Sequence, residues 1–284
     1  GGSAGVGGGG STAGQAGSAG ASTAGSGGQG GSAGSVASAG TGAAGQGGTA
    51  GGAGTGGSGG ASGSAGTSGV SSGGGDGVSH VPRLDGALKI LPFGDSITAS
   101  TCYRARLAEM LDASHPGDYD FVGTQNGDKG CGYTYDMAHE GHGGYLITQH
   151  TGEFTGWASA SPADVVLLHF ATNDVWNAVS TENILAAYGQ AVDAFRAQNE
   201  NVTILVAKLI PLEPDGCGHC NVATLNDAIP AWAESKASAT SPIIVVDQFT
   251  GYSAGADSDD KVHPNDAGSD KMATHWATAL DPLF

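Results

Sequence analysis

The 284-residue chain carries 27 acidic and 10 basic side chains, a formal net charge of −17, and every charged residue lies after position 75. Such a negative field repels the phosphates of nucleic acids and anionic membrane surfaces, so we expect neither as a partner. There is no run of 18 or more apolar residues, and we therefore expect no membrane span. The chain begins with glycine and not methionine, so we expect that a leader was removed or never included.

The first 75 residues are almost wholly Gly, Ser, Ala and Thr. Such a segment has too little apolar surface to offset the entropy lost on ordering. None of its glycine runs ends in the Gly-Lys-Ser/Thr of a phosphate-binding loop. We therefore expect residues 1–85 to be a disordered, flexible linker, and residues 86–284 to form one domain with a full hydrophobic core.

Five short apolar segments predict β-strands, and four stretches with apolar residues at helical spacing predict helices. The strands are expected at residues 88–93, 119–123, 164–170, 202–210 and 243–247, and the helices at 103–112, after Ser180, around 225–232 and from Asn265 onward. Strands that are apolar throughout and alternate with amphipathic helices indicate a parallel sheet covered on both faces. The predicted fold is a three-layer α/β/α sandwich with a five-stranded parallel sheet, similar to flavodoxin.

In such sheets, reactive groups gather at the carboxyl ends of the strands. The first strand runs into Gly-Asp-Ser, which places Ser96 at the start of a helix, where its backbone N–H can hold a developing anion. Asn173 follows the third strand and can donate to the same anion. After the fifth strand, Asp260 can accept from Nδ1–H of His263, which leaves Nε2 free to take a proton from Ser96. The sequence thus predicts acyl transfer by a serine nucleophile.

The motifs that contain these residues resemble those of the SGNH, or GDSL, hydrolases and occur in the same order. They are GDSI at residues 94–97, TND at 172–174 and DxxH at 260–263. Further segments resemble the branch related to carbohydrate esterase family 3, namely HEGHGGY at 139–145, CGHCN at 217–221, LNDAIPAWA at 225–233 and SPIIVVDQFTGY at 241–252. One departure is visible, because the family usually has Gly before TND and this chain has Ala171.

The resemblance implies an SGNH hydrolase fold and a serine esterase that needs no cofactor or metal. It makes Ser96 the nucleophile and assigns Asp260 and His263 to the proton relay. Gly144 and Asn173 complete the oxyanion hole with the backbone N–H of Ser96. Two alternatives stay open, since Asp259 could replace Asp260 and Gly143 could replace Gly144; the spacing to His263 and the family pattern favour Asp260.

The resemblance favours small acyl groups on plant polysaccharide, above all acetylated xylan, as the substrate. The sequence shows no long apolar lid segment to receive a fatty chain, which points in the same direction. Two other readings are a lipase-like or thioesterase-like acylhydrolase of longer esters and a non-catalytic carbohydrate-binding module. Enzymes of this branch are secreted and often attached to carbohydrate-binding modules. We therefore expect a secreted or cell-surface monomer whose linker joins it to another module or to a surface.

The four cysteines include a Cys-x-x-Cys pair, Cys217 and Cys220, which in a cytosolic chain would suggest redox or zinc chemistry. Because the linker and the resemblance imply secretion, we expect a local disulfide there instead. The accompanying hypothesis is that Cys102 pairs with Cys131 and stiffens the rim of the active site.

Several other polar residues have structural interpretations. We expect Asp95 to brace the serine turn through hydrogen bonds and Asp174 to accept hydrogen bonds at a helix start. Arg104 is expected to tie the first helix to a carboxylate. The His-Glu-Gly-His segment at residues 139–142 lacks the i, i+4 spacing of zinc proteases, so we predict no metal site there.

Overall fold

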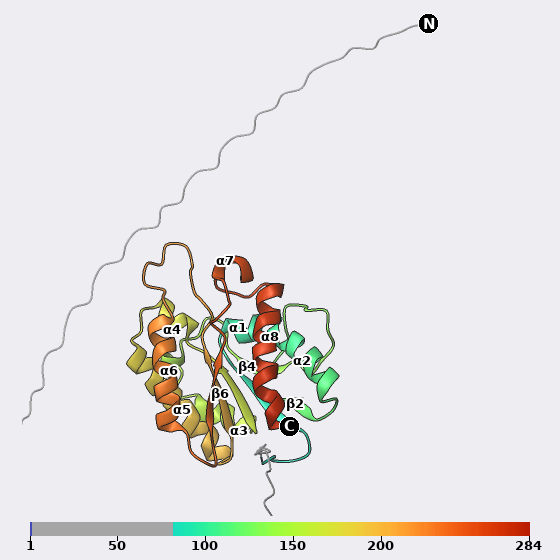
Figure 1. Ribbon diagram of the computed structural model, residues 1–284, viewed down its shortest axis with the longest axis vertical. Helices are drawn as coiled ribbons and strands as arrows, with labels where there is room; N and C mark the ends of the chain where they lie inside the picture. The colour runs from blue at the N-terminus through green and yellow to red at the C-terminus, as the bar shows by residue number, and fades with distance from the viewer. Residues whose placement is uncertain (2–81) are drawn as a thin grey trace, which may run out of the picture. The chain divides into compact units, whose positions relative to one another are not determined.

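The computed structural model describes residue 1 and residues 82–284 (Figure 1). The predicted linker over residues 1–85 therefore lies almost entirely outside the described residues and stays a prediction. The strands are β1 (Leu88–Gly94), β2 (Tyr119–Phe121), β3 (Gln125–Asn126), β4 (Ala138–Gly141), β5 (Val165–His169), β6 (Thr203–Lys208) and β7 (Ile243–Asp247). The helices are α1 (Ser96–Ser100), α2 (Tyr103–Ser114), α3 (Phe154–Ala160), α4 (Thr172–Trp176), α5 (Thr181–Gln198), α6 (Ala223–Lys236), α7 (Ala254–Asp257) and α8 (Asp266–Leu280), with the 3-10 helices η1 (Ile147–Gln149) and η2 (Asp281–Leu283).

The described strands form one mostly parallel sheet in the order β3-β4-β1-β5-β6-β7, and β2 also pairs with β1. All five predicted strands are present in it, which confirms the α/β sandwich. The sheet is larger than predicted because β4 pairs in parallel with the end of β1, and β3 pairs with β4 in antiparallel. Apolar alternation could not reveal these two strands, since β4 reads Ala-His-Glu-Gly and β3 has two residues.

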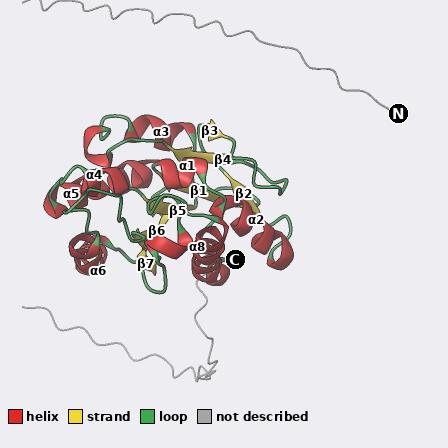
Figure 2. Ribbon diagram, turned by 90° about the horizontal axis from the view of Figure 1, so that it is seen from above, coloured by secondary structure: helices red, strands yellow, loops and turns green. Residues whose placement is uncertain are grey.

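Alternate side chains of the strands point into two separate cores, one on each face of the sheet. In β1, Leu91 packs with the core under α3, α5 and α6, whereas Ile90 packs with the core under α2 and α8. Figures 1 and 2 show these two helix layers on opposite sides of the sheet. Both side chains are completely buried, and burial of each stabilises the fold by about 1.5–3 kcal/mol.

Side-chain caps account for where the two longest helices, α5 and α8, begin. The Ser180 side chain accepts from the Asn183 N–H at the start of α5, and the Asn265 side chain accepts from the Gly268 N–H at the start of α8. Each such cap contributes about 1 kcal/mol. The predicted starts of these two helices are thereby confirmed.

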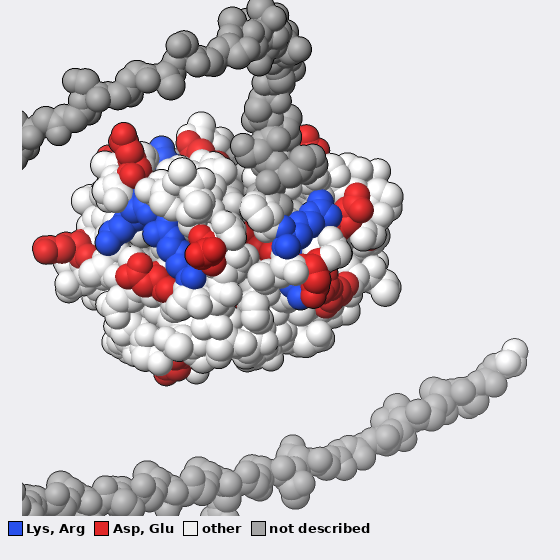
Figure 3. All heavy atoms as spheres, turned by 90° about the horizontal axis from the view of Figure 1, so that it is seen from below, with Lys and Arg blue, Asp and Glu red and all other residues white. Residues whose placement is uncertain are grey.

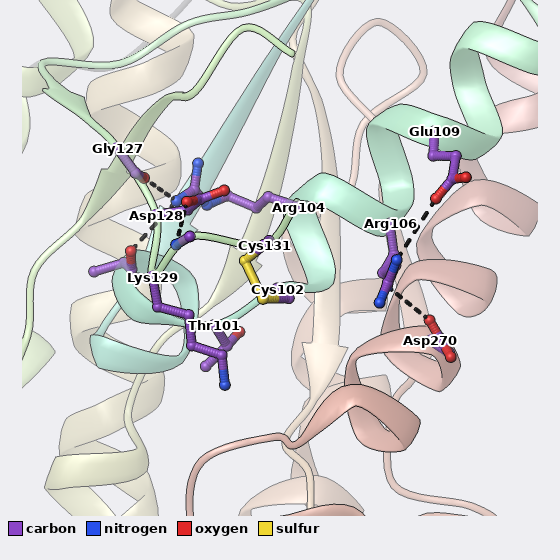
Figure 4. Close-up of a disulfide and its surroundings, with 12 residues drawn as sticks. Thr101, Cys102, Arg104, Arg106, Glu109, Gly127, Asp128, Lys129, Cys131 and Asp270 are labelled. Carbon is purple, nitrogen blue, oxygen red and sulfur yellow. Dashed lines mark hydrogen bonds and ion pairs between the residues drawn. A yellow bond between two sulfur atoms is a disulfide. The ribbon is translucent and has the colours of Figure 1, made fainter. Parts of the chain in front are cut away.

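Both expected disulfides are present, between Cys102 and Cys131 and between Cys217 and Cys220. Figure 4 shows the first, which joins the residue preceding α2 to the loop that follows β3. In the chain-entropy account, closing its loop stabilises the fold by roughly 3–4 kcal/mol.

The expectation for Arg104 was wrong. Its buried guanidinium donates to backbone carbonyls and not to a carboxylate; the acceptors are Thr98, Ala99, Gly127 and Met137. A guanidinium has five N–H donors in a fixed fork, so several irregular loop carbonyls can satisfy it. Backbone acceptors of this kind have no signature in the sequence.

On the face drawn in Figure 3, basic side chains lie beside acidic ones. Within residues 82–284, no helix combines the length and apolar character that crossing a bilayer requires.

Candidate active site

The first part of the site is the turn from β1 into α1, where Ser96 is the first helical residue. Asp95 caps this helix, since its Oδ1 accepts from Ile97 N–H at 3.0 Å, and its Oδ2 accepts from Thr172 N–H at 3.1 Å. A Cβ at Gly94 would lie 2.2 Å from a carbonyl oxygen of β5, so only glycine fits before this turn. The expected bracing role of Asp95 is confirmed, and the carboxylate also joins α1 to α4.

The second part is the loop between α7 and α8, which brings an imidazole to the serine. His263 Nε2 lies 2.8 Å from Ser96 Oγ, and His263 Nδ1 lies 2.7 Å from Asp260 Oδ2. Asp260 Oδ1 also accepts from the backbone N–H groups of His263 and Val262. Burial would raise the pKa of Asp260, but these hydrogen bonds outweigh it and lower the pKa. The ionised carboxylate therefore holds Nδ1–H toward itself and leaves Nε2 facing the serine.

The alternative carboxylate, Asp259, has another partner. Its side chain forms an ion pair with Lys129 at 3.6 Å, while its backbone N–H donates to the His263 carbonyl. Lys261 has a positive φ of 63°, a conformation that lets the loop turn back on itself. Of the two aspartates, Asp260 is the one that contacts the imidazole.

The third part is a glycine turn after β4. Tyr145 N–H donates to the His142 carbonyl at 3.3 Å, and Gly144 has a φ of +80°. This is the φ pattern of a type II turn, whose third residue favours glycine. The turn lies against the nucleophile, since a Cβ on Gly143 would be 3.9 Å from Ser96 Cβ.

Asn173 connects the glycine turn to α4. Its Nδ2 donates to the Tyr145 carbonyl at 2.9 Å. A side-chain amide has two N–H donors, so this bond leaves one for a ligand. The next residue, Asp174, accepts from Ile147 N–H at 2.8 Å and from Thr148 N–H and Oγ1 at 3.1 and 2.6 Å.

These contacts confirm Asp174 as an acceptor at a helix start, here that of η1. Burial raises its pKa, and the hydrogen bonds it accepts only partly offset this effect. Asn173 and Asp174 thus fix the chain on the C-terminal side of the glycine turn.

Glu140 and His142 fix the other side of the turn, a role that the sequence did not reveal. Buried Glu140 accepts from the Thr124 N–H and hydroxyl at 2.8 Å each, and its Oε1 lies 2.7 Å from His142 Nε2. The His142 ring stacks on Trp157 and on Tyr145, with centroids 4.2 and 5.1 Å away. The signal that could have revealed the pair is its i, i+2 spacing, which puts two side chains on one face of a strand.

His139, in the same segment, serves the backbone. Its Nδ1 accepts from Gly141 N–H at 2.9 Å, and burial lowers its pKa to about 3. Within residues 82–284, the one group of His, Cys, Asp and Glu close enough to hold a metal consists of Cys217, His219 and Cys220. Both of its sulfurs are joined in a disulfide, and a metal requires free thiolates.

Ala171, where the resemblance expects glycine, has a φ of +113° and is completely buried. An L-residue in this region is strained by about 1–3 kcal/mol. The strain is located at the entry to α4, two residues before Asn173.

The comparison with known families identifies the chain. The family of GDSL-like lipases and acylhydrolases matches residues 93–271, more than half of the sequence. The matched range includes Ser96, Gly144, Asn173, Asp260 and His263. The chain belongs to this family. Membership makes it a carboxylic ester hydrolase of the SGNH type, with the fold expected of one.

The solved structures similar to this chain include carbohydrate esterases. An acetyl esterase variant crystallised with acetate ion and a family 3 carbohydrate esterase from Talaromyces cellulolyticus are each 30% identical with TM-scores of 0.64; the matches cover 69% of this chain and 97% of theirs. A family 3 carbohydrate esterase from Clostridium thermocellum is 28% identical, with a TM-score of 0.58 and the same coverage. A multidomain esterase from Ruminococcus flavefaciens is 28% identical over 231 residues, which is 70% of this chain. The match covers 30% of that relative's length.

Proposed function

We propose that this SGNH esterase removes short acyl groups, above all acetyl, from plant polysaccharide such as acetylated xylan. The observation that carries the proposal is the line of contacts from Ser96 Oγ through the His263 ring to Asp260, at 2.8 and 2.7 Å. The small acyl group and the carbohydrate are supported by the similarity to acetyl esterases and family 3 carbohydrate esterases.

In the proposed mechanism, His263 Nε2 takes the proton of Ser96 Oγ as that oxygen bonds to the ester carbonyl carbon. The carbonyl π electrons move to oxygen, and the resulting oxyanion is held by the N–H groups of Ser96 and Gly144 and by Asn173 Nδ2. The C–O bond to the alcohol breaks as His263 returns the proton to the leaving oxygen. Water then attacks the acyl-enzyme in the same way and releases acetate and free Ser96.

We further propose that the protein acts outside the cell on a polysaccharide, as a monomer. Two disulfides in the described domain suit an oxidising compartment. The net charge of −17 disfavours nucleic acid as a partner. The Gly/Ser-rich N-terminal segment would join the domain to another module or to a surface.

The test is acetate release from acetylated xylan by the wild type and by Ser96→Ala, with nitrophenyl esters of increasing chain length alongside. We expect acetate from the wild type alone and rates that fall as the acyl chain lengthens. Preference for long esters with xylan untouched would refute the acetyl assignment. Turnover by Ser96→Ala would remove the serine from the mechanism.

A further inference from the structure

A pocket of about 570 Å³ opens beside the nucleophile and has no role in the mechanism above. Its lining includes Ala99, three residues after Ser96 in α1, and Gly143, whose Cβ would lie 3.9 Å from Ser96 Cβ. The lining also includes the segment from Gln125 to Lys129, which comprises β3 and the start of the loop after it and is called the polar wall below. An acetyl group is far smaller than this space, so the pocket is available to another part of the substrate.

The lining of the pocket is polar. None of the twelve residues that line it is Val, Leu, Ile, Met, Phe or Trp. A fatty acyl chain gains about 0.8 kcal/mol per CH₂ only where apolar atoms bury it, and no large aliphatic side chain lines this pocket for that purpose. Amides at Gln125 and Asn126 can instead both donate to and accept from hydroxyl groups. No hydrogen bond to the Asn126 side chain occurs within the described domain, so its amide is available to a ligand.

Three contacts hold the polar wall in place, and Figure 4 shows the first two. Buried Arg104 donates to the Gly127 carbonyl, and the Cys102–Cys131 disulfide ties the loop to the start of α2. Lys129 Nζ lies 3.6 Å from Asp259 Oδ2, which connects the wall to the loop that carries the imidazole. A wall fixed before binding loses little entropy when a ligand arrives.

The wall carries more negative than positive charge. Lys129 is the one Lys or Arg among the lining residues and forms an ion pair with Asp259 at 3.6 Å, and Asp128 adds a second carboxylate. A carboxylate on the ligand would therefore meet net repulsion here. The lining therefore suits a neutral polyhydroxylated ligand better than a uronate.

We infer that this pocket binds neutral sugar rings of the alcohol half of the ester, and that Gln125 and Asn126 determine the preference for carbohydrate esters over simple ones. The inference rests on the proposed function, because it assigns this space to the leaving alcohol of the Ser96 reaction.

The test compares kcat/KM for acetylated xylotetraose with kcat/KM for 4-nitrophenyl acetate in the wild type, in Asn126→Ala and in Gln125→Ala. We expect the ratio of the two constants to fall at least tenfold in Asn126→Ala, chiefly through a higher KM for the oligosaccharide. Gln190→Ala removes an exposed amide on α5, away from the pocket, and should leave the ratio unchanged. A ratio within twofold of wild type in both pocket variants would overturn the inference.

A direct binding measurement separates this inference from the proposed function. Titration calorimetry of unacetylated xylotetraose into the wild-type protein needs no turnover. Binding that weakens at least tenfold in Asn126→Ala supports the pocket even if acetylated xylan proves not to be cleaved. Binding that is absent, or equal in wild type and variant, overturns the pocket even if acetate is released. Cleavage of neither ester by the wild type would refute the proposed function alone.

Discussion

Substitution of Gly144 by alanine tests the glycine turn most sharply. Gly144 has a φ of +80°, and a Cβ built there meets no heavy atom within 4 Å. The cost of Gly144→Ala is therefore a backbone cost, about 1–2 kcal/mol for an L-residue in a left-handed conformation. The variant can avoid this cost by flipping the peptide between Gly143 and residue 144, as in a type I turn. The flip would turn the N–H of residue 144 away from its present direction.

The loss of kcat in Gly144→Ala depends on which of two responses costs less free energy in the transition state. In the transition state, the variant either restores the original turn, at about 1–2 kcal/mol, or forgoes one oxyanion donor, at roughly 3–4 kcal/mol. Restoring the turn costs less, so kcat should fall about 5- to 30-fold. The free energy of unfolding should change little, because alanine also lowers the entropy of the unfolded chain, by about 0.4–1 kcal/mol.

The assay is kcat on 4-nitrophenyl acetate together with urea unfolding. Gly143→Ala is the matched control, because Gly143 is not in the left-handed region and its Cβ would make an ordinary 3.9 Å contact with Ser96. Wild-type kcat in Gly144→Ala would refute the role of this N–H. A loss above a hundredfold would show that the turn cannot be restored. A greater loss in Gly143→Ala would assign the donor to Gly143.

Three further predictions concern the same region. Asn173→Ala should lower kcat about a hundredfold or more, because its donor cannot be restored; near-normal turnover would remove Asn173 from the site. Ala171→Gly relieves a backbone strain near the upper end of about 1–3 kcal/mol. Two effects oppose this gain: glycine increases the entropy of the unfolded chain, which costs about 0.5–1 kcal/mol of stability, and the loss of the buried methyl group costs about 0.8 kcal/mol. Urea unfolding should show about 1 kcal/mol of added stability, and a loss would contradict the strain. His139 has a pKa of about 3 in the fold and about 6.5 when unfolded. Below pH 6.5 only the unfolded chain takes up this proton, so stability should fall toward pH 3, and less steeply in His139→Asn.

The sequence predicted the helices and strands that are long enough for their apolar residues to recur at a regular spacing. The five apolar strands and the helices α2, α5, α6 and α8 were found in this way. Helices of four or five residues, such as α4 and α7, have too few turns for an apolar stripe to recur. The strand β4 has few apolar residues of its own, and its burial depends on residues outside it. The carboxylate of Glu140 in this strand accepts from Thr124 N–H and contacts His142 Nε2. Tertiary context of that kind is not visible along the chain.

The contacts of Ser96, His263 and Asp260 could be predicted from the sequence, whereas their roles in a reaction stay a prediction. Ser96, Asp260 and His263 carry their chemistry in their side chains, so their types and order indicate a role. The partner of Arg104 was mispredicted because backbone carbonyls leave no sequence signal. The pairing of Glu140 with His142 was not predicted, because it depends on how the segment packs against Thr124 and Trp157.

The oxyanion donors and the base are positioned by different means. Asp95 accepts from Thr172 N–H at the entry to α4, and Asn173 donates to the Tyr145 carbonyl in the glycine turn. The segments that carry the three proposed donors follow β1, β4 and β5, and they are therefore joined to one another by these hydrogen bonds and by the pairing of the strands. His263 comes from a loop beyond β7, at the far edge of the sheet, and its orientation depends on the bonds of that loop. Substitutions among the donors should thus be coupled and non-additive, while substitutions in the histidine loop should change proton transfer and leave the donor geometry intact.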